Sequence, residues 1–113
     1  MSKESKHQIK ISVTLDENKI PSKIQLDSPE DGFEKCNTPA MLLSLWDRDN
    51  LETLKIDLWI KQMSVDEMKF FIHQTLDALG DTYTRSTSDE EMGAILKEFS
   101  RYFAKKLKLY EQK

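Results

Sequence analysis

The stretch Leu54-Lys55-Ile56-Asp57-Leu58-Trp59-Ile60, followed closely by Ser64-Val65-Asp66-Glu67, decides how the rest of the chain is interpreted. In residues 54–60, Leu and Ile alternate with Lys, Asp and Trp, and a period of two is typical of a half-buried strand. Ser64 followed three residues later by Glu67 is a capping box, in which each side chain satisfies a backbone N–H of the other residue. The chain therefore contains both a strand and a helix.

Two similar alternations lie nearer the N-terminus. Residues 9–15 and 20–26 are separated by Asp16-Glu17-Asn18-Lys19, a run that suits a turn. Together they predict a β-hairpin. Pro21 has no N–H for a sheet, so we expect the second strand to lie at a sheet edge or to begin late.

The segment between these strands and residue 54 contains turn residues first and apolar residues later. Asp27 to Asn37 includes Pro29, Gly32 and several carboxylates, which predict a loop. Thr38-Pro39 resembles an N-cap followed by a proline at the first helical position. We therefore expect a short, nearly all-apolar helix through residues 41–46.

Two longer helices are predicted at the C-terminus. The first follows Ser64 and should end near residues 82–85. A second capping box at residues 88–91 should begin the last helix, which opens with acids and closes with lysines, as the helix dipole favours. Their apolar stripes, at helical spacing, are Val65, Met68, Phe71, Ile72, Thr75, Leu76 and Leu79 in one, and Met92, Ile95, Leu96, Phe99, Tyr102, Phe103, Leu107 and Tyr110 in the other.

The predicted element order is ββαβαα. Alternating strands favour a three-stranded, mainly antiparallel sheet with one wet face, and the helices should pack on the other. This is a two-layer α+β fold. At 113 residues we expect a single domain over 1–113, with residues 1–7 and 111–113 flexible.

Composition excludes several classes of function. The chain has 20 Asp and Glu against 17 Lys and Arg, a net charge of −3, so the basic footprint of a nucleic-acid binder is absent. Its one cysteine cannot form an internal disulfide, which favours the reducing cytoplasm. No signal-peptide pattern is present, and no apolar run approaches the ~18 residues of a transmembrane segment.

The residues most often used in catalysis or metal binding are scattered. His7, Cys36 and His73 show no metal-binding spacing, so we expect no metal and no cofactor. Cys36 lies near Glu34, which disfavours a reactive thiolate. His73 and Asp77 are four residues apart and are interpreted as a pair on a solvated helix face, the alternatives being a pH-responsive contact or a cryptic small-ligand or enzymatic site. We expect the protein not to be an enzyme.

Two aromatic residues break the amphipathic patterns. Trp59 falls on the polar face of its strand and Phe70 on the polar side of its helix. Each either anchors a protein interface, where Trp is enriched, or is covered by the C-terminal helix or the acidic loop. A basic ridge on the outer face of the last helix is a secondary contact or a solvated face, and consists of Lys97, Arg101, Lys105 and Lys108.

Several stretches together resemble the gliding motility protein GldC family. The most distinctive runs from Ile56 to Met68, and the others are Ile11–Pro21, Met41–Asp47, Phe70–Leu76 and Asp81–Thr87. The resemblance implies a small cytoplasmic accessory protein of the surface gliding machinery of Bacteroidetes, a machinery linked to a dedicated secretion system. No catalytic residues come with the family.

The leading hypothesis is therefore a non-enzymatic accessory or assembly module that acts through protein–protein contacts. A chaperone-like binder of secreted or unfolded clients, using the apolar 39–47 helix as a movable cover, is the alternative. The exposed edge of the second strand leaves homo-oligomer formation open.

Overall fold

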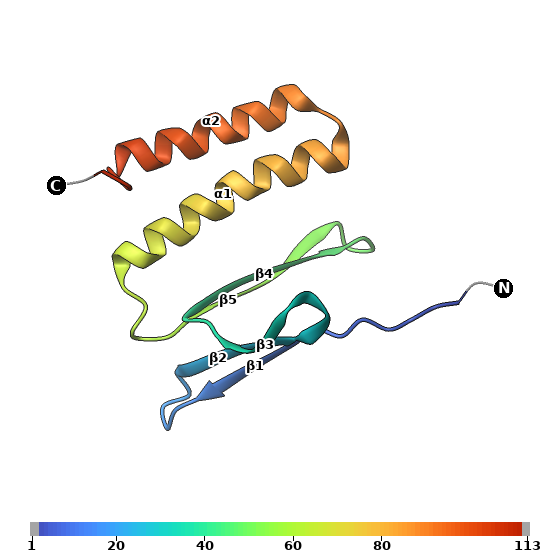
Figure 1. Cartoon of the computed structure of the whole chain (residues 1–113), viewed down its shortest axis with the longest axis vertical. Helices are drawn as coiled ribbons and strands as arrows, with labels where there is room; N and C mark the ends of the chain where they lie inside the picture. The colour runs from blue at the N-terminus through green and yellow to red at the C-terminus, as the bar shows by residue number, and fades with distance from the viewer. Residues whose placement is uncertain (1–2, 112–113) are drawn as a thin grey trace. The chain divides into compact units, whose positions relative to one another are not determined.

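The computed structural model of the protein describes residues 3–111. The chain divides into two units, one ending at Met63 and the other beginning at Ser64 (Figure 1). The first contains the strands and the second the two helices, so the expected α+β class is confirmed. A single domain over 1–113 remains a prediction, and so does the flexibility of 1–7 and 111–113, which includes residues outside the described range.

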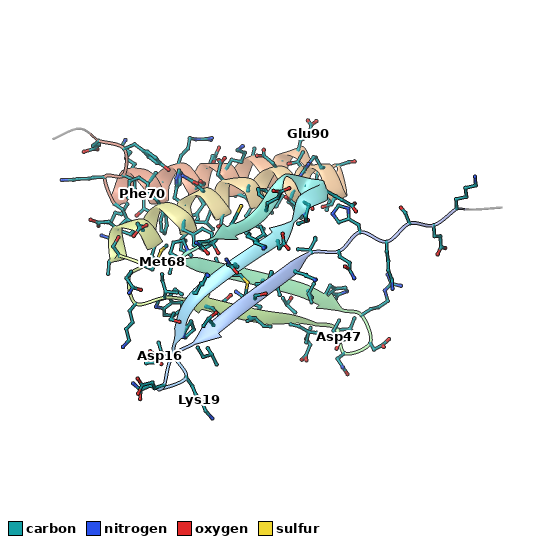
Figure 2. The ribbon with its side chains drawn as sticks, turned by 60° about the horizontal axis from the view of Figure 1, so that its bottom comes forward. Asp16, Lys19, Asp47, Met68, Phe70 and Glu90 are labelled. Carbon is teal, nitrogen blue, oxygen red and sulfur yellow. The ribbon has the colours of Figure 1, made fainter. Side chains whose placement is uncertain are left out.

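The first unit begins with the predicted hairpin. It consists of β1 (Lys10–Leu15) and β2 (Pro21–Ser28), paired antiparallel. At the turn, which Figure 2 marks with Asp16, one carboxylate oxygen of Asp16 accepts hydrogen bonds from the backbone N–H groups of Asn18 and Ile20, at 2.8 and 3.0 Å. The bond from Ile20 lowers the pKa of Asp16. Asp at this position therefore stabilises the turn.

The second strand was expected at a sheet edge or with a late start, and the edge position is wrong. β2 lies in the middle of a three-stranded antiparallel sheet, between β1 and β3 (Phe33–Asn37). Pro21 is tolerated because it is the first residue of β2, where a missing N–H interrupts little of the ladder.

The expected loop over residues 27–37 is also wrong. Its turn residues are confined to a short 3₁₀ turn, η1 (Pro29–Asp31), and to Gly32, whose φ of 85° is readily adopted only by glycine. After Gly32 the chain returns as β3, with Cys36 opposite Leu26. Backbone pairing with β2 forms this strand, and such pairing requires no apolar periodicity in the sequence.

The predicted helix through residues 41–46 is a strand. β4 (Ala40–Asp47) pairs antiparallel with β5 (Glu52–Trp59), the strand predicted from residues 54–60, and the two form a separate two-stranded sheet. We call this pair the β4–β5 ribbon. Residues Met41, Leu43 and Leu45 lie opposite the apolar alternation of β5, and this cross-strand match outweighs the helix propensity of Met and Leu.

Asp47 forms the turn of the ribbon (Figure 2). Its carboxylate accepts hydrogen bonds from the side-chain amide of Asn50, at 2.8 Å, and from the backbone N–H of Asp49, at 3.1 Å. The Asn50 amide is the main reason that the pKa of Asp47 is lowered. The turn thus reverses the chain where the notional helix was expected to end.

Thr38 and Pro39 connect the two sheets of this unit. The backbone N–H of Thr38 donates to the carbonyl of Ile24 at 2.8 Å, and that of Ile60 donates to the carbonyl of Pro39 at 2.9 Å. Ile24, at 1% exposed, is buried beside this junction. Thr-Pro therefore marks a crossing from one sheet to the other, and the observed order is five strands followed by two helices.

The second unit is an antiparallel pair of helices, α1 (Val65–Thr87) and α2 (Glu90–Lys106) (Figure 1). The capping box of α1 is confirmed: the Ser64 hydroxyl accepts from the N–H of Glu67 at 3.0 Å, and the Glu67 carboxylate accepts from the N–H of Ser64 at 3.1 Å. That the helices cover one face of a sheet remains a prediction.

The second predicted capping box is wrong. Ser88 ends α1 in a left-handed conformation, with φ of 62°, and its N–H donates to the carbonyl of Thr84. Asp89 is the N-cap of α2 and accepts from the N–H of Met92 at 3.0 Å. α1 is consequently longer than expected and ends at Thr87.

Candidate protein interaction surfaces

One face of the β4–β5 ribbon is apolar from Met41 to Leu45 on β4 and from Leu54 to Leu58 on β5. The register places Leu43 opposite Ile56 and Leu45 opposite Leu54. Leu45, Leu54 and Ile56 are 57%, 48% and 52% exposed, although side chains of this size are usually buried. Contiguous exposed apolar surface of this kind is typical of an interaction site.

The other face of the ribbon carries both tryptophans of the chain. Trp59 lies opposite Ala40 and is 55% exposed, and Trp46, at the far end of β4, is 63% exposed. Sequence reasoning selected Trp59 but missed Trp46, because it assigned residue 46 to a helix. The two-residue spacing of Leu42, Ser44 and Trp46 would have placed Trp46 on one face of a strand. The register puts Trp59 on that same face.

Phe70 is only half buried in the helical pair, and Tyr110 covers it. The two rings meet edge to face, with centroids 5.0 Å apart and planes at 74°. Tyr110 lies just beyond α2, next to the buried Leu109. Tyr110 therefore shields only part of the Phe70 ring, and the interface role of Phe70 stays a prediction.

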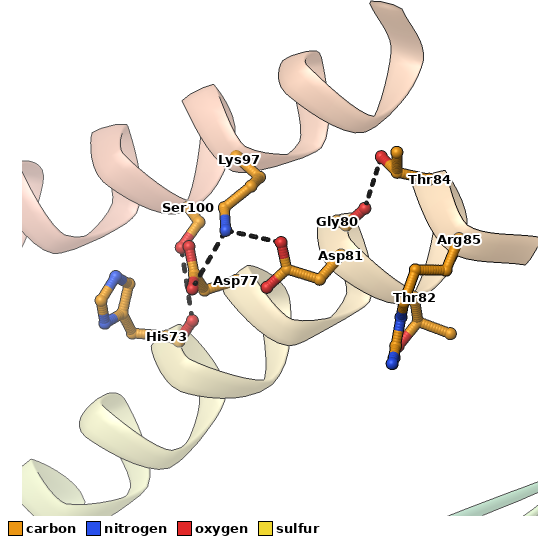
Figure 3. A network of polar contacts seen from close by, with 9 residues as sticks. All are labelled: His73, Asp77, Gly80, Asp81, Thr82, Thr84, Arg85, Lys97 and Ser100. Atoms are coloured by element: carbon orange, nitrogen blue, oxygen red, sulfur yellow. Dashed lines mark hydrogen bonds and ion pairs between the residues drawn. The ribbon is translucent and has the colours of Figure 1, made fainter. Parts of the chain in front are cut away.

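His73 does not form the expected pair with Asp77. Its Nδ1 lies 3.0 Å from the hydroxyl of Tyr110, whereas Asp77 lies toward Lys97, whose Nζ is 3.6 Å from an Asp77 carboxylate oxygen (Figure 3). The geometry on which a His73–Asp77 ligand site would depend is therefore missing. Sequence spacing could not reveal this, because both partners come from beyond α1.

Lys97 does not share the outer face of α2 with the rest of the predicted basic ridge. Its Nζ lies 2.8 Å from Asp81 as well as 3.6 Å from Asp77, so it points between the helices (Figure 3). The hydrogen bond with Asp81 raises the pKa of Lys97. Arg101 and Lys105 are exposed on α2, and Lys108 lies beyond its end with φ of 55°.

The helices contact each other through small and polar side chains. Gly80, Gly93 and Ser100 are buried, and the Ser100 hydroxyl donates to the carbonyl of His73 at 3.4 Å (Figure 3). Leu96 and Phe103 of the predicted α2 stripe are half buried, whereas Met92, Ile95, Phe99 and Tyr102 of the same stripe are exposed. Mid-helix glycines were the signal in the sequence, since they are costly in a helix unless close packing requires them.

The remaining candidate ligands lie apart in the first unit. His7 contacts Asp31 at 2.7 Å and Glu30 at 3.0 Å, and the hydrogen bond with Asp31 raises its pKa. Cys36 is half buried in β3. Among residues 3–111, no three His, Cys, Asp or Glu side chains are grouped so as to hold a metal ion.

None of the helices in the described part of the chain is both long and apolar enough to cross a membrane.

Comparison with known protein families gives a match over most of the chain. The model of a family described as gliding motility-associated protein GldC-like matches residues 21–109, which begin at the first residue of β2 and end at the buried Leu109. No curated protein and no solved structure matches the chain.

Proposed function

The chain belongs to the GldC-like family of gliding motility-associated proteins, and from this premise we propose that it is a non-enzymatic accessory or assembly protein of bacterial gliding motility. It acts in the cytoplasm, through contacts with protein components of the gliding or secretion machinery. Family membership supports the link to motility. The β4–β5 ribbon supports the mode of action.

The observation that carries this proposal is the exposure of Trp59 and Trp46 on one face of the ribbon. Tryptophan is among the residues that most often dominate binding energy at interfaces, because a large flat side chain loses much water-exposed area for little entropy. An isolated two-stranded ribbon is only marginally stable in water. A partner that covered the tryptophans would therefore stabilise the ribbon and gain affinity at once.

Site-specific crosslinking in the native gliding cell tests the proposal. A photoreactive amino acid at position 59 should capture a small, reproducible set of proteins. The matched control is the same residue at position 15, since Leu15 is also an apolar strand residue, 52% exposed, but lies on β1. Equal capture from both positions would count against a specific ribbon interface.

Substitution then separates the candidate contacts. Trp59→Ser and Trp46→Ser should each weaken capture and gliding, whereas Leu15→Ser should leave both unchanged. Reversing Arg101 and Lys105 to Glu tests the basic contact separately, because neither residue is in the ribbon. Gliding that survives loss of both tryptophans at normal protein levels would contradict the proposal.

A chaperone-like client binder is the second candidate, and exposure of large apolar residues on both faces of the ribbon favours it. The version with a movable 39–47 helix is excluded because residues 40–47 are a paired strand. A client binder should crosslink from position 59 to many secreted proteins at low occupancy. A machinery component should crosslink to few proteins at high occupancy.

A further inference from the structure

The α2 helix carries two distinct seams. One faces α1 through Gly93, Lys97 and Ser100. The other, which we call the α2 strip, consists of Met92, Ile95, Phe99 and Tyr102, exposed by 45%, 47%, 52% and 59%. At 3.6 residues per turn the strip lies roughly 150° around the helix from the first seam. It is therefore too far round to be covered by α1.

The spacing of the α2 strip is that of a helix-packing seam. Its residues follow one another at intervals of three, four and three, as do the a and d positions of a coiled coil. A narrow seam of this kind fits into the groove of a second helix. The element that would cover the α2 strip is therefore a helix with an apolar stripe of similar length.

Charge along α2 identifies which helix fits. Its first turn holds Glu90 and Glu91, and its last turn holds Lys105 and Lys106. A second α2 packed antiparallel places the acidic end of each helix beside the basic end of the other, and the opposed helix dipoles also attract. Parallel packing would instead bring like charges together at both ends.

We propose that two copies of this chain associate through their α2 strips, antiparallel and about a two-fold axis. The midpoint of the strip falls at the level of residue 97, so the axis crosses the strip at the level of residues 97 and 98. Glu91 of one copy then lies near Lys105 of the other, and the contact occurs twice by symmetry. The interface uses no residue of the β4–β5 ribbon and is independent of the proposed motility function.

Cysteine crosslinking tests both the contact and its direction. In a Cys36→Ser background, Glu98→Cys lies near the axis and should crosslink to itself with a short bifunctional thiol reagent. Glu91→Cys and Lys105→Cys should each fail to do so alone but crosslink when mixed, which a mass tag on one copy makes visible. Self-crosslinking of Glu91→Cys would indicate parallel helices and overturn the proposal.

A substitution in the strip supplies a second readout. Phe99→Glu should raise the dissociation constant of the dimer by at least about 10-fold in sedimentation velocity. The substitution removes a large apolar contact, and because both copies carry it the loss occurs twice in each dimer. Ala94→Glu is the matched control, because Ala94 is exposed on α2 but lies away from both seams. Circular dichroism confirms that each variant remains helical.

The other occupants of the strip give different results. A monomeric wild-type chain at high concentration, with no crosslink from position 98, overturns the proposal. So does a crosslink from a photoreactive amino acid at position 98 that maps to β4 or β5, because a sheet rather than a second α2 would then cover the strip. If Phe99→Glu fails to fold, the cysteine pairs still decide the question in an otherwise wild-type helix.

Discussion

Gly80 and Gly93 face each other across the two helices: a Cβ built on Gly80 would stand 3.2 Å from the carbonyl oxygen of Gly93, and one built on Gly93 would stand 3.3 Å from the carbonyl oxygen of Gly80. Only glycine at both positions allows the backbones to approach this closely. The added atom at Gly93 would also overlap the hydroxyl of Thr84. The crossing of α1 and α2 is therefore set by missing side chains rather than by interlocking apolar ones.

Replacing Gly93 with Ala should destabilise the helical pair by about 1–2 kcal/mol, because overpacking outweighs the gain in helix propensity. Urea unfolding followed by circular dichroism measures this free energy. In a Thr84→Ala background the overlapping hydroxyl is gone, so Gly93→Ala should cost less there, with a coupling of roughly 1 kcal/mol. Strictly additive effects would mean that Thr84 is not what excludes a larger residue.

The contacts of His7 should depend on pH in a defined window. Asp31 raises the pKa of His7 above 6.5, so their attraction is fully present below pH 6.5 and is lost as the pH rises through the raised value. The pKa of Asp31 is lowered below 3.8, mainly by the hydrogen bond from the Ser28 hydroxyl. The stabilisation that the Asp31 carboxylate contributes is therefore lost only as the pH falls through that lower value.

Proton NMR titration of the His7 ring should accordingly give a pKa above 6.5. Asp31→Asn should return that pKa towards 6.5, whereas Glu30→Gln should have the smaller effect because Glu30 acts on the ring only through its charge, without the hydrogen bond that Asp31 provides. An unchanged His7 titration in Asp31→Asn would show that the 2.7 Å contact does not persist in solution.

Tyr110 should stabilise the end of the helical pair more through its ring than through its hydroxyl. Tyr110→Phe removes only the bonds to His73 and Gln74, which are exposed, and should cost about 0.5 kcal/mol. Tyr110→Ala also removes the edge-to-face contact with Phe70 and should cost about 1 kcal/mol more. Denaturant unfolding separates the two, and equal losses would contradict this division.

Substitutions at the helix caps should distinguish the motif that begins at Ser64 from the similar one that begins at Ser88. Ser64→Ala should cost about 1 kcal/mol because it removes a hydrogen-bonded N-cap, and Asp89→Ala should cost a similar amount. Ser88→Gly should instead be neutral or stabilising, because Ser88 holds a φ of 62° that glycine adopts without strain. Thermal unfolding measures all three. A destabilised Ser88→Gly would support the capping box that the sequence predicted there.

The parts of the fold that were predicted correctly from the sequence are those formed by interactions between residues close together in the chain. The alternation at residues 54–60, the turn at Asp16 and the Ser64–Glu67 cap each involve residues within a few positions of one another. Their partners are neighbours in the chain, so spacing alone reveals them.

The errors have the opposite character. Residues 41–46 were predicted as a helix because Thr38-Pro39 resembles a helix start and the run after it is nearly all apolar, yet Leu43 pairs with Ile56 across the turn. Residues 33–37 carry no strand signal, because their strand exists only through the backbone of β2. Ser88 matched a cap pattern but follows a helix that continues further than its apolar stripe suggested.

The candidate site shows the same division. Trp59 was recognisable from its position on the polar side of an alternating strand, whereas Trp46 joined it only when β4 paired with β5. Lys97 looked like part of a solvated ridge until α1 brought Asp77 and Asp81 to it.

Periodicity, capping and motif order along the chain are enough to establish the α+β class, the start of α1 and the family. The central place of β2, the strand conformation of β4 and the inward direction of Lys97 emerge only in the folded molecule. Strand pairs and interhelical ion pairs are stabilised by groups from different elements, and no local pattern encodes how those groups come together.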